Sequence, residues 1–104
     1  MTEHPGLVLR DGPTGRRAGL AGGPDVWEIV RAIRSARVAE PGLDPDELLT
    51  LVTCNTGVPA HLLRTAVRYR ASYPAEIDRE IEAATRAEDA AEQAWRRETD
   101  LLAR

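Results

Sequence analysis

The C-terminal stretch 75–104 constrains the fold most, because it contains neither Gly nor Pro and is rich in Ala and Glu. Such a sequence predicts one long helix, which at 1.5 Å per residue reaches roughly 40 Å. Positions 77, 81, 84, 88, 91, 95, 98 and 102 alternate four and three apart, and six of the eight are apolar. A domain of 104 residues is too small to cover such a helix completely.

We therefore expect this apolar stripe to bind a partner protein or a second copy of the chain. Its candidate contact residues are Ile81, Ala84, Ala91, Trp95 and Leu102. Trp95 is the strongest candidate anchor, since large aromatic side chains carry much of the energy of protein interfaces. The alternative is that Trp95 packs back on its own domain.

Three further helices are predicted upstream, each set off by turn-forming residues. Asp25 begins the first, with Glu28 placed for a capping box, and this helix is expected to fade near Ala36. Asp44-Pro45-Asp46-Glu47 begins a short apolar helix that ends before Asn55-Thr56-Gly57. Pro59 opens a third helix through about Tyr73, and Pro74 ends it. A short apolar helix, a tight turn and a helix with polar and basic residues are typical of a helix-turn-helix.

Residues 7–20 predict a β-hairpin, because two short apolar segments flank the turn-forming run 11–15. The predicted fold is mainly α: an N-terminal β-hairpin, a three-helix helix-turn-helix core and a long C-terminal helix. We divide it into a hairpin plus helix-turn-helix DNA-binding domain, 1–74, and a partner-binding or dimerisation helix, 75–104.

Charge is distributed unevenly along the chain, whose formal net charge is −3. Residues 1–74 carry nine arginines and eight acids, whereas residues 75–104 carry five arginines and nine acids, and there is no lysine. No acid lies between Glu47 and Glu76, and that interval contains three arginines. This polarity favours a basic binding surface on the helix-turn-helix despite the acidic total.

The third helix is therefore the predicted DNA-binding element, with His61, Arg64, Thr65 and Arg68 spaced to share its outward face. Arginine binds guanine edges or phosphates, and Thr and His contact bases or backbone. The alternative is an ordinary solvated helix face. Arg16 and Arg17 of the hairpin, with Arg10, either add DNA contacts or form a basic edge that discourages strand aggregation.

Catalytic and metal-binding patterns are weak in this sequence. Two histidines and the single Cys54 do not form a persuasive metal set, and capping explains the acids around Asp44. Phosphate-binding loops and nucleophile elbows are missing from the sequence. We expect a non-enzyme without metal or cofactor. The lone cysteine, the lack of a secretory layout and the lack of a long apolar run favour a cytoplasmic protein that is not bound to a membrane.

The chain also resembles the family of domain of unknown function 433. The resemblance covers residues 7 to about 81, and its most specific parts are the Val26-Trp27-Glu28-Ile29-Val30 helix start and the segment Tyr69–Asp78. It implies a small bacterial helix-turn-helix protein, many of whose relatives are regarded as VapB-type antitoxins encoded beside PIN-like ribonuclease toxins. Residues 22–25 depart from the Gly-Thr-Arg usual in the family, and the helix beyond about residue 82 lies outside the resemblance.

The sequence thus predicts an antitoxin-like regulator of transcription in a toxin–antitoxin system. It would bind double-stranded operator DNA as a homodimer and neutralise a cognate toxin through its C-terminal helix. Two alternatives remain open: a stand-alone helix-turn-helix transcription factor, and an adaptor or assembly protein with the same fold and no DNA affinity.

Overall fold

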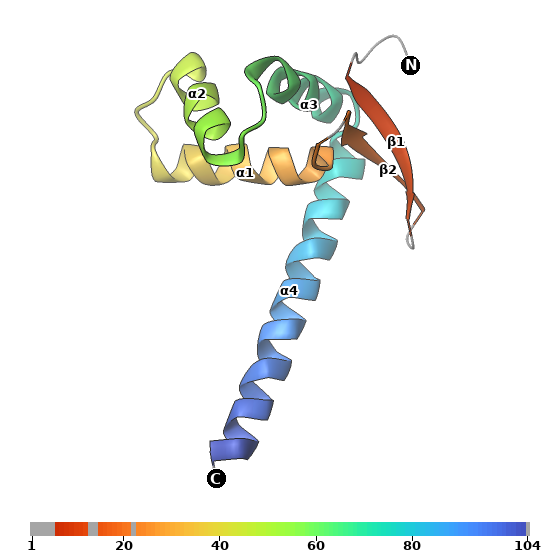
Figure 1. Cartoon of the computed structure of the whole chain (residues 1–104), viewed down its shortest axis with the longest axis vertical. Helices are drawn as coiled ribbons and strands as arrows, with labels where there is room; N and C mark the ends of the chain where they lie inside the picture. Colours follow the sequence, from red (N-terminus) through yellow and green to blue (C-terminus); the bar gives the residue numbers. More distant parts are fainter. Residues whose placement is uncertain (1–5, 13–14, 22, 104) are drawn as a thin grey trace.

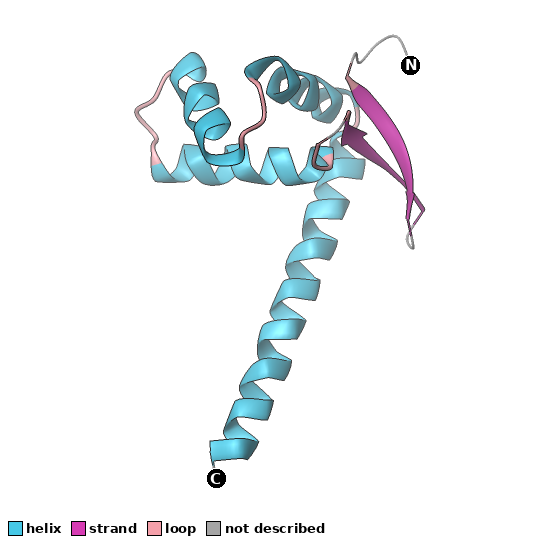
Figure 2. Cartoon of the chain, in the orientation of Figure 1, coloured by secondary structure: helices cyan, strands magenta, loops and turns pink. Residues whose placement is uncertain are grey.

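In this computed structural model the chain forms a two-stranded hairpin and four helices (Figure 1). The structure describes residues 6–12, 15–21 and 23–103, with the side chains of 10–12, 15 and 16 left out. The elements are β1 (Leu7–Gly12), β2 (Gly15–Leu20), α1 (Val26–Ala39), α2 (Pro45–Thr56), α3 (Ala60–Ser72) and α4 (Pro74–Ala103). The prediction of a mainly helical chain with an N-terminal hairpin is confirmed (Figure 2).

The hairpin pairs its strands in antiparallel register, from Leu7 opposite Leu20 to Gly12 opposite Gly15. Because side chains alternate between the two faces of a strand, Ala18 and Leu20 of β2 point together into the core, and both are buried. The open end of the hairpin is held by two hydrogen bonds: the Ala21 N–H donates to the Gly6 carbonyl (2.7 Å), and the Leu20 N–H donates to that of Pro24 (2.9 Å).

Both predicted capping boxes are present. The backbone N–H of Asp25 donates to Glu28 Oε1 (3.1 Å), and that of Asp44 donates to Glu47 Oε1 (3.0 Å). In the same capping box, the Glu47 N–H donates to Asp44 Oδ1 (2.8 Å). These bonds satisfy amides that have no partner within the helix, so α1 and α2 begin where the sequence predicts.

The expectation that the first helix fades near Ala36 is wrong, because α1 continues to Ala39. Arg37 supplies the physical reason: its Nη1 donates to the carbonyl oxygen of Leu43 (2.6 Å), with a longer contact to that of Pro41 (3.3 Å). A guanidinium that binds carbonyls just past the helix end stabilises the last turn and complements the helix dipole.

The core lies between α1, α2 and α3, and the hairpin and the first turns of α4 complete it at the N-terminal end of α1 (Figure 1). Its largest fully buried side chains are Leu20, Val26, Ile29, Val52, Leu63 and Ile77. Ile77 belongs to α4, so the beginning of the long helix is part of the packed body. The rest of α4 leaves this body and accounts for a molecule that measures 56 × 36 × 24 Å.

Candidate nucleic-acid interface

The turn between α2 and α3 is short and held by local hydrogen bonds. Gly57 has φ 75°, in the left-handed region that glycine adopts without strain, and its N–H donates to the Thr53 carbonyl (2.8 Å). The Val58 N–H donates to Thr56 Oγ1 (3.2 Å), and the Val58 side chain is buried. This turn places α3 across α2 in the order of a helix-turn-helix.

The outward face of α3 carries His61, Arg64 and Arg68, all of them exposed. They follow one another at intervals of three and four, so their side chains lie on one side of the helix. Arg64 Nη2 donates to Asp46 Oδ1 at the start of α2 (2.8 Å), and Arg68 Nε donates to the Arg64 carbonyl (3.4 Å). Among the residues that the structure describes, Arg68 forms no ion pair.

The prediction that Thr65 shares this outward face is wrong. Its side chain is only 5% exposed, and its hydroxyl donates to the carbonyl of His61 (3.1 Å). Thr65 lies three positions after Leu62, whose side chain lies next to Gly6 at the start of the hairpin. Gly6 therefore lies beside this side of α3, and the buried side chain of Thr65 has no access to a ligand.

Arg70, also on α3, holds the fold together. Arg70 Nη2 and Arg34 Nη2 donate to different oxygens of Asp78 on α4, each at 2.9 Å. These hydrogen bonds hold the pKa of the Asp78 carboxyl below its usual range. The contact joins α1, α3 and α4, and sequence reasoning missed it because 44 residues separate Arg34 from Asp78.

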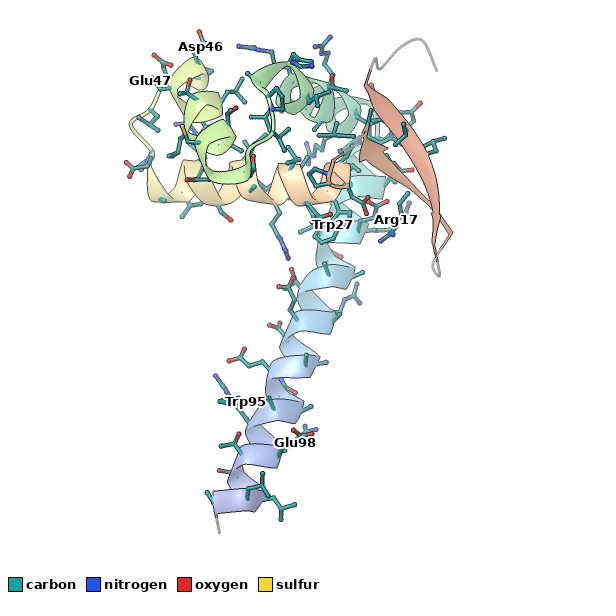
Figure 3. All side chains as sticks on the ribbon, viewed as in Figure 1. Arg17, Trp27, Asp46, Glu47, Trp95 and Glu98 are labelled. Carbon is teal, nitrogen blue, oxygen red and sulfur yellow. The ribbon has the colours of Figure 1, made fainter. Side chains whose placement is uncertain are left out.

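The start of α2 adds negative charge beside the candidate interface. Asp44, Asp46 and Glu47 are all exposed, and Figure 3 labels Asp46 and Glu47 at the start of α2. Asp46 pairs directly with Arg64. Carboxylates at a helix N-terminus stabilise the helix, but they repel phosphate groups that approach the same end. A duplex that bound α3 would have to separate Arg64 from Asp46.

Arg17 of the hairpin faces the body of the protein. Its Nη1 lies 3.4 Å from Oδ2 of Asp25, whose side chain is buried. The same region contains Glu80, whose pKa is raised by burial and by the nearby carboxylates of Glu76 and Asp25. Arg17 therefore supplies positive charge to a cluster of acids in the hairpin–α4 junction. The side chains of Arg10 and Arg16 lie outside the described part of the structure.

The predicted partner-binding residues of α4 fall into two groups. Ile81 is partly buried against the protein's own core, and Ala84 is half-buried beside Trp27. Ala91, Trp95 and Leu102 are exposed, so the alternative in which Trp95 packs back on its own domain is wrong (Figure 3). The body covers the first turns of α4 and leaves the second half bare.

No protein-family model, curated protein or solved structure matches this chain. Within residues 6–12, 15–21 and 23–103, no group of three or more His, Cys, Asp or Glu side chains is arranged to hold a metal ion. None of the helices in the described part combines the length and the hydropathy that crossing a bilayer requires.

Proposed function

We propose that the protein is an antitoxin-like regulator that binds double-stranded operator DNA through α3. The observation that carries this proposal is the exposed guanidinium pair Arg64 and Arg68, on a helix that follows a tight turn. Neither side chain is covered by the acidic α4. In a homodimer joined through the hairpin or α1, two copies of α3 would enter successive major grooves about 34 Å apart.

The direct test is a fluorescence-anisotropy titration with duplex DNA at several salt concentrations. Each phosphate contact that is lost reduces the slope of log affinity against log salt by roughly one, so Arg64→Ala and Arg68→Ala should each weaken binding and flatten the slope. Arg86→Ala is the matched control, because Arg86 is exposed on α4 and pairs only with Glu82 in the described structure. Equal affinities for all four proteins would refute the assignment of α3.

The Arg64–Asp46 contact allows a test in the opposite direction. Asp46→Asn keeps the size of the side chain, removes a negative charge and leaves Arg64 available to phosphate. We expect tighter DNA binding from this variant, with a modest loss of helix stability of about 0.3–1 kcal/mol from the lost dipole interaction. Unchanged or weaker binding would argue that DNA does not approach this end of α2.

The exposed half of α4 supports the second part of the proposal, the capture of a cognate PIN-like toxin in the cytoplasm. A bare helix with Trp95 and Leu102 exposed offers an apolar anchor, and its acidic surroundings suit a basic partner. Deletion of residues 84–104 should abolish toxin capture in a pull-down and leave DNA binding intact. Capture that persists would exclude this helix.

An adaptor without DNA affinity is the competing function, and the exposed carboxylates of Asp44, Asp46 and Glu47 favour it. The salt titration separates the two functions, because an adaptor would show no DNA binding and therefore no dependence of DNA affinity on salt. A stand-alone transcription factor would bind DNA in the same way and have no toxin partner.

A further inference from the structure

An apolar groove runs between α1, α2 and α3. Its main hollow has a volume of about 520 Å³, and apolar side chains of all three helices line it, among them Ile33, Leu48, Leu49 and Val67. A smaller hollow of about 180 Å³ shares Ile33 and Val67 with it and extends it along α1 to Val30. We call the combined feature the α1–α3 groove. It has the apolar floor that binds one face of an amphipathic helix.

Three arginines line the main hollow of this groove, and they differ in what they already bind. The two in the smaller hollow, Arg34 and Arg70, both bind Asp78. Arg37 donates to backbone carbonyls at the end of α1, and Arg64 pairs with Asp46. Arg68 has a single contact of 3.4 Å to a backbone carbonyl, and no carboxylate of the described chain reaches it. A ligand of the groove would therefore gain most by placing a carboxylate against Arg68.

The end of α4 has the complementary arrangement. The residues three and four positions from Glu98 are Ala94, Trp95, Leu101 and Leu102, all apolar. The exposed fraction is 62% for Trp95, 75% for Leu101 and 85% for Leu102. We call these four residues with Glu98 the C-terminal patch. It is an apolar surface with one acid at its centre, on a helix half that no other element covers (Figure 3).

Covering this patch is favourable only if Glu98 gains a cation, because a carboxylate buried without a partner costs several kcal/mol. Two parallel copies of α4 would place Glu98 against Glu98, so this pairing supplies no cation. The α1–α3 groove supplies both an apolar floor and Arg68. The protein's own patch is out of reach of its own groove, because α4 is one continuous helix that leads away from the body (Figure 1).

We propose that the C-terminal patch of one copy binds in the α1–α3 groove of a second copy, with Glu98 against Arg68 and Trp95 on the apolar floor. The argument rests on apolar and charge complementarity within this chain and does not depend on DNA or toxin binding. The contact is heterologous, so it closes into a dimer by reciprocal exchange or continues as a chain of copies.

A charge exchange tests this pairing in the absence of DNA. Sedimentation over a range of protein concentrations should show self-association of the unaltered chain. Arg68→Glu or Glu98→Arg alone should weaken association by roughly 30-fold or more, as expected when one partner of a desolvated charge pair is lost. The double variant should recover most of the affinity. Asp100→Arg is the matched control, since it makes the same charge change two positions from Glu98, on the opposite side of α4 from the patch, where Asp100 is exposed.

The other outcomes are distinguishable. If Trp95→Ala weakens association while both charge reversals leave it unchanged, α4 pairs with α4 and the proposal is wrong. A chain that stays monomeric at all concentrations also overturns it. Circular dichroism of each variant confirms folding. As a second readout, one copy with Val67→Cys and another with Leu102→Cys, both with Cys54→Ser, should form a mixed disulfide on oxidation.

Discussion

Replacing Ile77 with alanine tests whether α4 is anchored in the core or merely continues from it. Ile77 is fully buried where α4 meets α1 and α3. The substitution removes three carbon atoms, each worth about 0.8 kcal/mol in transfer free energy, and leaves a cavity. We expect the free energy of unfolding to fall by about 3 kcal/mol, within the range of about 2–5 kcal/mol known for such changes.

The measurement is urea unfolding followed by circular dichroism, at a concentration where the chain is monomeric, because self-association would add apparent stability. Ile77→Val should cost only about 1 kcal/mol. Leu102→Ala is the matched control on the same helix, and since its side chain is exposed it should change stability by less than about 0.5 kcal/mol. If Ile77→Ala costs no more than Leu102→Ala, α4 is not docked as described and the placement of Asp78 beside Arg34 and Arg70 is also wrong.

Three other predictions concern the turn and two titrating groups. Gly57→Ala should lower the free energy of unfolding in urea by about 1–2 kcal/mol, because φ at Gly57 is positive and strains any residue with a Cβ. A steric clash does not contribute, since a Cβ there would meet no atom within 4 Å. Gly42 is equally open but has no positive φ, so Gly42→Ala should be nearly neutral. Burial and a hydrogen bond to Glu76 raise the pKa of Tyr69 above its usual value of 10.0. The protonated phenol therefore contributes its full stabilisation below pH 10.0, and this stabilisation is lost as the pH rises above 10.0. Tyr69→Phe should flatten the alkaline limb of a plot of Tm against pH. Arg70 and Arg34 lower the pKa of Asp78 below its usual value of 3.8. The Asp78 carboxylate therefore contributes its full stabilisation above pH 3.8, and this stabilisation is lost as the pH falls below 3.8. If Asp78→Asn leaves the acid limb of the plot of Tm against pH unchanged, this contact is contradicted.

Local chemistry made the starts of α1 and α2 and the turn at Gly57 predictable from sequence, whereas both helices end later than predicted, at Ala39 and Thr56. Asp25 with Glu28 and Asp44 with Glu47 satisfy free amides within one turn, so their effect needs no knowledge of the fold. Gly57 likewise acts through its own backbone. Each of these features joins residues at most four positions apart.

The error at Thr65 arose where distant segments meet. Helical spacing placed Thr65 with Arg64 and Arg68, but Thr65 is buried on the side of α3 where Gly6 lies against Leu62. The groove also escaped sequence reasoning, because α1, α2 and α3 must pack before Ile33, Leu49 and Val67 lie together. A hydrophobic pattern shows which residues can be buried, but the tertiary arrangement decides which of them stay open to a ligand.

The two proposed surfaces share Arg68, so DNA binding and groove-mediated association must compete. By linkage, each copy whose Arg68 is held by Glu98 of another copy is removed from the DNA-binding population. Glu98→Arg should therefore raise the apparent DNA affinity at protein concentrations where the unaltered chain associates, and have a smaller effect below them. Asp100→Arg makes the same change in charge on the opposite side of α4. A gain in affinity common to both variants therefore reflects general attraction to phosphate, and only the excess for Glu98→Arg measures the competition. If the two variants gain equally at every concentration, Arg68 cannot serve both surfaces.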